Sequence, residues 1–167
     1  MERRDLFKII AAGAVASPAL SQSVFSAHQI AILDRIADII IPTDEQSPGA
    51  HEAGVAMYLD LAASLNSQRL HAWMHGIELV EAQSNSVFSK PFLECTRAQQ
   101  EQLVELMARN EGQPQNDLER FFTSLKPAVV DGYRNSEIGV KQFMRWEGNQ
   151  YEIAAWKGAC NHPEHQS

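Results

Sequence analysis

Helical spacing of apolar residues is the feature that most limits what this chain can form. From about residue 26 onward, apolar side chains recur at intervals of three and four, which places them on one face of an α-helix. No segment of useful length alternates between apolar and polar residues as a half-buried β-strand does. The sequence therefore predicts an all-α domain, a compact bundle of about five helices joined by turns.

Capping patterns and prolines fix where these helices are expected to begin and end. Ser26 with Gln29, and Thr96 with Gln99, fit the capping box, in which two side chains satisfy backbone amides reciprocally. Pro127 lies inside the last long apolar pattern, so we expect a kink or a break there. The expected helices are residues 26–41, ended by Pro42, then 50–65, 68–84, 96–109, and one that begins at Asn116-Asp117.

The C-terminal part differs from the rest. From Gly132 to Ser167 the periodicity is weak, and only residues 139–146 suggest a short helix. Glycines and aromatic residues are interspersed here, namely Gly139, Phe143, Trp146, Gly148, Tyr151, Trp156 and Gly158. Such an irregular tail needs a surface to pack on, and the sequence leaves open whether this is the domain itself or a partner subunit.

Residues 1–21 have the three zones of a signal peptide. Basic residues come first, followed by an apolar run from Ile9 to Leu20 and small residues at Ala19 and Ser21, before Gln22. The run is shorter than the roughly 20 residues that a membrane-spanning helix needs. We therefore expect a signal peptide at 1–21, a helical domain at 22–158 and a flexible tail at 159–167. The small residues before Gln22 fit a cleavage site, and the sequence leaves open whether the signal is cleaved there or retained.

The basic zone narrows the export route. Its residues Arg3, Arg4, Phe7 and Lys8 resemble the twin-arginine pattern. Proteins that follow this route usually fold, or load a cofactor, before they cross the membrane. The expected location is the periplasm.

Composition and missing motifs exclude several functions. A net charge of −7, from 14 basic and 21 acidic residues, argues against nucleic-acid binding. The sequence has no glycine-rich phosphate or dinucleotide loop and no nucleophile elbow. It also has no haem-attachment motif or iron–sulfur spacing. We therefore assign no catalytic residue, cofactor or metal to this chain.

Histidines are the strongest argument for an enzyme. His71 and His75 lie four residues apart and would share a helix face, but no catalytic glutamate lies between them. A second group, Cys160, His162 and His165, is close to the C-terminus. A solvated face is the favoured interpretation of the first pair, and a small metal-dependent periplasmic enzyme remains an alternative.

Acidic side chains offer weaker candidates. The pairs Asp34–Asp38 and Glu101–Glu105 are expected on solvated helix faces. Asp44, in the turn after Pro42, would either cap backbone amides or meet an arginine of a partner.

The two cysteines, Cys95 and Cys160, are candidates for a disulfide, because an oxidising compartment favours such bonds. Two free thiols are the alternative.

Two neighbouring segments carry a family resemblance. Residues 37–44, Ala-Asp-Ile-Ile-Ile-Pro-Thr-Asp, and 47–55, Ser-Pro-Gly-Ala-His-Glu-Ala-Gly-Val, resemble the signature of the gluconate 2-dehydrogenase subunit 3 family. The resemblance extends over Gln29–Gly158. It continues through Phe121-Phe122, Gly132-Tyr133, Gly139, Trp146-Glu147-Gly148-Asn149 and Trp156-Lys157-Gly158, although relatives often have a tyrosine and Asn-Pro around positions 146–150.

The resemblance implies a non-catalytic small subunit of a periplasmic sugar or polyol dehydrogenase. In this family's complexes a large flavoprotein of the glucose–methanol–choline type holds FAD and oxidises the substrate. A multihaem cytochrome c often accepts the electrons and can hold the complex at the membrane. The small subunit supplies the signal for the twin-arginine translocase, and so escorts and stabilises the flavoprotein.

Partner contacts are expected on the turn after the first helix and on the aromatic tail. A stand-alone helical binding protein or chaperone is the remaining alternative. The expected interface residues are Ile41, Pro42, Thr43, Asp44, Pro48, Gly49, Gly54, Val55, Tyr133, Trp146, Gly148, Asn149 and Trp156.

Overall fold

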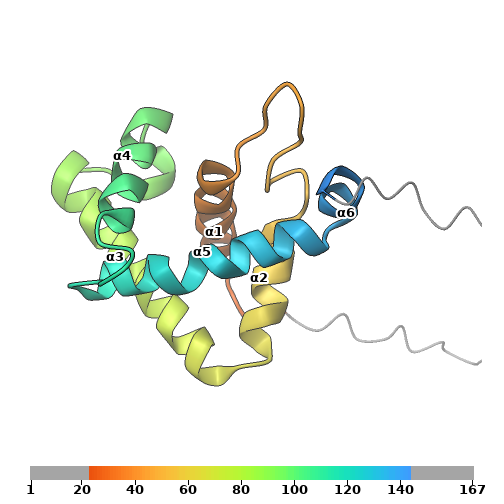
Figure 1. Ribbon diagram of the computed structural model, residues 1–167. Coiled ribbons are helices and arrows are strands. Elements are labelled where there is room, and N and C mark those ends of the chain that lie inside the picture. The colour runs from red at the N-terminus through yellow and green to blue at the C-terminus, as the bar shows by residue number, and fades with distance from the viewer. Residues whose placement is uncertain (1–22, 144–167) are drawn as a thin grey trace, which may run out of the picture.

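The computed structural model describes residues 23–143, and these residues form helices and turns without a strand. The elements in chain order are α1 (Ala27–Ile40), α2 (Val55–Ser64), α3 (Ser67–Phe88), the short 3-10 helix η3 (Phe92–Glu94), α4 (Arg97–Ala108), α5 (Asp117–Asn135) and α6 (Glu137–Phe143) (Figure 1). The all-α prediction is confirmed.

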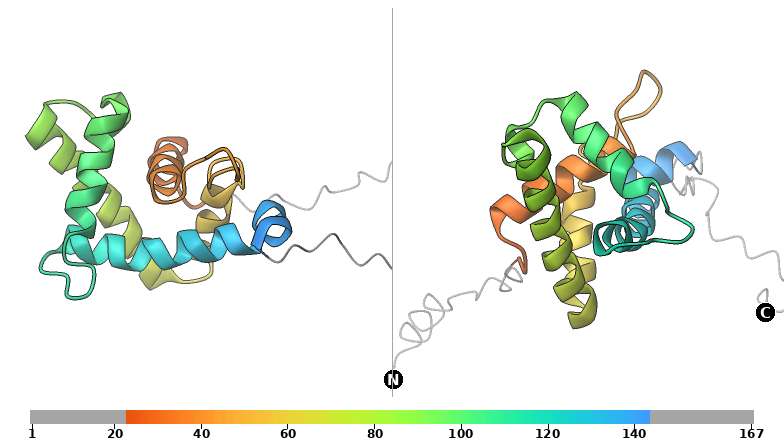
Figure 2. Two further views of the ribbon diagram at one scale, coloured as in Figure 1. Left: turned by 45° about the horizontal axis from the view of Figure 1, so that its top comes forward. Right: turned by 90° about the vertical axis from the view of Figure 1, so that its left-hand side faces the viewer.

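Helix α5 organises the bundle, since it packs against each of the other five α-helices. Helices α3 and α4 lie at one end of α5 and α6 lies at the other (Figure 2). Its buried side chains Phe121, Phe122, Leu125 and Val129 follow the predicted inward face. They belong to a core that also contains Ile32, Leu33, Ile36, Leu59, Trp73, Ile77, Phe92, Leu103 and Met107.

The predicted N-caps are confirmed. Ser26 accepts a hydrogen bond from the backbone N–H of Gln29 at 3.2 Å, and the Gln29 side chain accepts one from the Ser26 N–H at 2.9 Å. Thr96 forms the same capping box at the start of α4. Asn116 accepts from the Glu119 N–H at 2.9 Å and caps α5. Local sequence therefore determines where these three helices begin.

The second helix begins at Val55, so the expected start at Ala50 was wrong. Residues 50–54 form turns, and Gly54 adopts the left-handed conformation with φ of 67° as the N-cap of α2. The backbone N–H of Ala50 donates to the Ile41 carbonyl at 2.8 Å instead of starting a helix. This backbone bond across the loop and the left-handed Gly54 therefore delay the start of the helix to Val55.

Helix α5 continues through Pro127. We had expected either a kink or a break at this proline, and the break does not occur. Proline removes one backbone hydrogen bond from a helix interior. Burial of Leu125 and Val129 on the opposite side of this turn compensates for that loss. The helix reaches Asn135, so Gly132 and Tyr133 belong to it and not to an irregular tail. The short helix α6 begins at Glu137, two residues before the start expected at 139.

The start of the described chain is fastened to α2. Oδ1 of the buried Asp60 accepts hydrogen bonds from Ser23 Oγ at 2.8 Å, from the Val24 N–H at 3.0 Å and from the Phe25 N–H at 3.1 Å. The Phe25 side chain is 3% exposed and joins the core. The first described residues, 23–25, therefore belong to the folded body.

Candidate partner-binding loop

The family-like segment forms one loop, from Ile41 to Gly54, between α1 and α2, and we call it the 41–54 loop. Figure 1 shows it projecting from the helical body beyond α1. Its two arms meet at Gly49, where an added Cβ would lie 2.5 Å from the Thr43 nitrogen and 2.7 Å from the Ile41 oxygen. Only glycine allows the two backbones to approach this closely.

Side chains within the loop hold its tip in one shape. Oδ1 of Asp44 accepts from the backbone N–H groups of Gln46 at 2.8 Å and Ser47 at 2.7 Å. The Asp44 N–H donates to the Ser47 carbonyl at 2.9 Å and closes the turn. Asp44 is therefore a capping residue, one of the two roles expected for it. The tip is a preorganised turn, and its conformation does not depend on a partner.

A second set of bonds joins the two arms of the loop. Thr43 Oγ1 donates to Glu52 Oε2 at 2.7 Å and accepts from the Gly49 N–H at 2.9 Å. The same Glu52 oxygen accepts from the Gly49 N–H at 3.2 Å. The hydrogen bond from Thr43 lowers the pKa of Glu52 from its ordinary value, so this carboxylate stays charged at neutral pH.

Tyr133 on α5 anchors the loop from below. Its hydroxyl donates to the Pro48 carbonyl at 2.7 Å and lies 2.6 Å from Ser47 Oγ. The side chain is 2% exposed, so in the described structure Tyr133 is a buried support and not an exposed anchor for a partner. Gly49 and Val55 are also buried. The predicted interface residues that are exposed are Pro42, Thr43, Asp44 and Gly54, and Ile41 and Pro48 are partly exposed.

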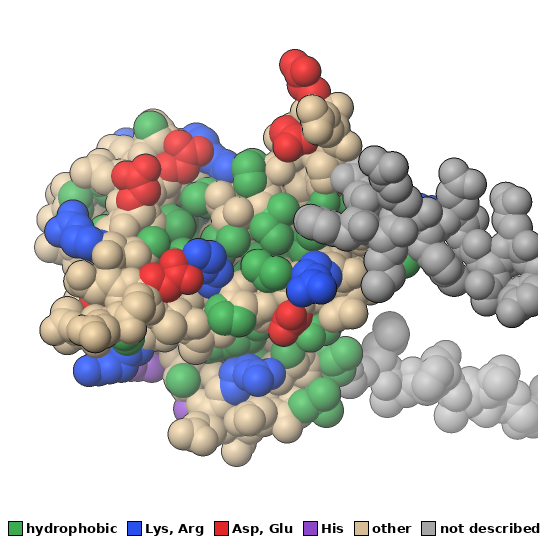
Figure 3. Space-filling model, in the orientation of Figure 1, with side chains coloured by type: hydrophobic (Ala, Val, Ile, Leu, Met, Phe, Trp, Pro, Cys, Tyr) green, Lys and Arg blue, Asp and Glu red, His purple; other side chains and the backbone are tan. Residues whose placement is uncertain are grey.

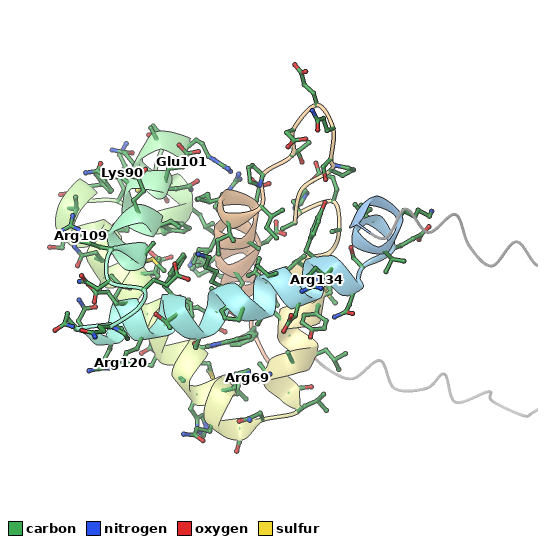
Figure 4. The ribbon with its side chains drawn as sticks, viewed as in Figure 1. Arg69, Lys90, Glu101, Arg109, Arg120 and Arg134 are labelled. Carbon is green, nitrogen blue, oxygen red and sulfur yellow. The ribbon has the colours of Figure 1, made fainter. Side chains whose placement is uncertain are left out.

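The exposed edge of the loop is acidic. Residues 42–46 are all exposed, and Figures 3 and 4 show acidic side chains at the tip, standing clear of the helices. The Asp44 carboxylate is occupied by the turn. Glu45 makes no hydrogen bond or ion pair with other described residues, so its charge is available at the end of a rigid loop.

A polar groove of about 370 Å³ lies beside the loop, between α1 and the start of α4. His51 Nδ1 lies 2.7 Å from Asp34 Oδ2, and this hydrogen bond raises the pKa of His51 from its ordinary value. Arg97 forms ion pairs with Asp38 and with Glu101, the latter at 2.7 Å. Asp34 and Asp38 therefore pair with basic groups from other segments, whereas Glu101 pairs with Arg97 one turn earlier on α4, at the spacing that helical ion pairs favour.

A larger hollow lies elsewhere in the described residues. It has a volume of about 700 Å³ and lies between α3, α4 and the start of α5, with Leu79, Leu106 and Leu118 in its lining. Glu119 in this lining bonds to the Gln115 N–H and to the Asn110 side chain, so its carboxylate already has partners. We assign no chemistry to this hollow.

The other sequence candidates stay apart or fall outside residues 23–143. His71 and His75 are exposed on α3, and no group of three or more potential metal ligands comes together in the described part. Cys95 is buried, with its Sγ 3.1 Å from Ser84 Oγ. Arg3, Arg4, Phe7, Lys8, Trp146, Gly148, Asn149, Trp156, Cys160, His162 and His165 lie outside the described residues, so the export signal, the tail contacts and the disulfide remain predictions.

Comparisons with known proteins agree with the family-like segments. Residues 27–151 match the family model described as gluconate 2-dehydrogenase subunit 3. No curated protein and no solved structure matches the chain significantly. None of the helices within residues 23–143 is both long and apolar enough to cross a membrane.

Proposed function

Since this chain belongs to the gluconate 2-dehydrogenase subunit 3 family, we propose that it is the small, non-catalytic subunit of a periplasmic FAD-dependent sugar or polyol dehydrogenase. The flavoprotein subunit would hold FAD and oxidise the substrate, and a cytochrome c subunit would accept the electrons. This chain would supply the twin-arginine signal and stabilise the flavoprotein. One observation carries the proposal: the family-like segment forms a rigid, exposed loop.

Rigidity makes the 41–54 loop suitable for binding a protein. Its conformation is set by bonds to Asp44, Thr43, Glu52 and Tyr133, so little further ordering is required when a partner binds. Preorganisation of this kind improves affinity because less conformational entropy is lost on binding. The loop would therefore act as a fixed projection that fits a complementary hollow on the flavoprotein.

Charge indicates what the flavoprotein would present to the loop. Residues 42–46 carry Asp44 and Glu45 and no basic residue. An arginine or lysine of the flavoprotein opposite Glu45 would complement this charge, whereas an acidic surface would repel it. We expect the charge reversal Glu45→Arg to weaken the complex. Glu105→Arg serves as the control, because Glu105 is exposed on α4 and forms no ion pair with the other described residues.

The export role can be tested by co-expression with the flavoprotein. With Arg3 and Arg4 both changed to lysine, we expect the flavoprotein to remain active in the cytoplasm and absent from the periplasm. The control changes Arg35 and Arg69 to lysine, which keeps the same charge in the folded body. Normal periplasmic activity without this chain, or with the twin-lysine variant, would refute the escort role. Stoichiometric zinc or iron in the purified subunit would favour the alternative of a metal-dependent enzyme.

A further inference from the structure

Helix α2 has an exposed apolar stripe. Met57, Leu61 and Leu65 are 66%, 53% and 79% exposed, and they are three of the four large hydrophobic residues that are exposed in the described part of the chain. They are spaced four residues apart, so they lie on successive turns of one side. Figure 3 shows hydrophobic side chains gathered on the surface over α2.

The rest of α2 is already covered. Val55, Leu59 and Ala63 are fully buried in the core. Asp60, the one charged residue of α2, is buried and bonded to residues 23–25. A helix that is apolar all round is normally buried on all sides. Its remaining side therefore requires a cover that residues 23–143 do not provide.

Helix α5, which leads to the end of the described chain, packs against α2. Tyr58 of α2 lies against Gly132 of α5, where an added Cβ would be 2.6 Å from the tyrosine ring. After Asn135 the chain forms α6 and leaves it at Phe143, with residues 144–167 still to follow. The stripe is about 12 Å long at 1.5 Å per residue. An extended segment from 144 to 156 spans about 43 Å, so it can reach the whole stripe.

The chemistry and extent of this segment fit the stripe. Residues 144–156 include Trp146, Tyr151, Ile153 and Trp156, which bury large apolar areas when they pack. The family match ends at residue 151, eight residues beyond α6, so the beginning of this segment belongs to the family's domain. The N-terminal apolar run, residues 9–20, lies outside the match.

We propose that residues 144–156 fold back as a strap across Met57, Leu61 and Leu65 of α2. The sequence left open whether the tail packs on the domain itself or on a partner subunit, and this proposal chooses the domain itself. The strap belongs to the subunit alone, so the proposal does not depend on the dehydrogenase function or on export.

Limited trypsin digestion tests the strap, because Arg145 provides a cleavage site inside it. The experiment uses the chain without residues 1–21, which keeps every described residue. We expect Leu61→Glu to increase the rate of cleavage after Arg145 at least tenfold over the wild type, since the charge would displace the strap. Val87→Glu is the matched control, because Val87 is 48% exposed on α3 and lies outside the stripe. Its cleavage rate should stay within twofold of the wild-type value.

A second variant changes the proposed strap and leaves the sequence of α2 unchanged. Trp156→Ala should raise hydrogen exchange of the backbone amides of residues 57–65, while exchange in α4 stays unchanged. This readout also covers the case in which Leu61→Glu fails to fold. Rapid wild-type cleavage after Arg145, or unchanged exchange in Trp156→Ala, would overturn the proposal. So would a dimer that Leu61→Glu dissociates, or protection of Arg145 only after flavoprotein is added, since the stripe would then belong to another molecule.

Discussion

Replacing Tyr133 by phenylalanine separates the support role of this residue from a role in partner binding. The change removes one hydroxyl and keeps the ring, so packing on the core is retained. The lost hydroxyl donates to the Pro48 carbonyl at 2.7 Å and contacts Ser47 Oγ at 2.6 Å. Because the side chain is 2% exposed, water cannot readily replace these contacts.

The expected loss follows from the bonds that remain. A typical hydrogen bond contributes about 0.5–1.5 kcal/mol, and a buried group left without a partner costs about 1–3 kcal/mol. The Pro48 carbonyl still accepts from Ser47 Oγ at 3.2 Å, so it is not left entirely without a donor. We therefore expect Tyr133→Phe to lower the free energy of unfolding by about 1.5 kcal/mol. The same loss, confined to the 41–54 loop, would increase hydrogen exchange there about tenfold.

Urea unfolding followed by circular dichroism measures the first quantity, and hydrogen exchange of residues 47–50 measures the second. Tyr58→Phe is the matched control, because Tyr58 is partly buried against α5 and its hydroxyl bonds to no described residue. We expect that control to change stability by less than about 0.5 kcal/mol. If the two variants were equally stable, or if Tyr133→Phe weakened flavoprotein binding without opening the loop, the support role would be wrong.

Three further predictions concern the first residues, the loop and the groove. Asp60→Ala removes the acceptor of three hydrogen bonds and should destabilise the chain by about 3 kcal/mol in urea unfolding, whereas Asp60→Asn keeps an oxygen and should cost about half as much. Gly49→Ala forces a Cβ against backbone atoms and should cost about 1–3 kcal/mol; Gly112→Ala, which enters open space, should cost less than about 0.5 kcal/mol by the same assay. The pKa of His51 is raised by its bond to Asp34, so this bond stabilises the folded state fully below about pH 6.5. The stabilisation disappears as the pH rises through the pKa of His51 in the folded state. The stability difference between wild type and Asp34→Asn should therefore shrink from pH 6 to pH 8. The difference should stay below about 0.5 kcal/mol, because the His51 side chain is 64% exposed. A difference that is the same at both pH values would contradict the ion pair between His51 and Asp34.

The parts of the fold that sequence could predict are those governed by neighbouring residues. Ser26, Thr96 and Asn116 each cap a helix through a bond to the residue three positions on, and such bonds are visible as a spacing. The inward face of α5 follows from helical periodicity in the same way. In both cases the information lies within a few positions of the residue concerned.

The start of α2 was mispredicted because its cause is not local. Residues 50–53, Ala-His-Glu-Ala, contain no strong helix breaker, but the Ala50 N–H is bonded to Ile41 and Gly54 adopts a left-handed conformation. Pro127 posed the opposite problem, since a local helix breaker is tolerated where buried neighbours hold the helix together. In each case, interactions outside the helix itself outweigh the propensity of the residues.

The candidate site shows the same division between local and distant causes. The turn at Asp44 could be expected from sequence, because an aspartate that bonds two residues ahead is a common turn former. The role of Tyr133 could not, since it depends on a bond to a residue 85 positions earlier. Sequence resemblance marked Tyr133 and the 41–54 loop together without indicating why they occur together. The structure supplies a physical link between them: the buried tyrosine hydroxyl bonds to Pro48 and holds the loop from inside, while residues 42–46 are exposed at its tip.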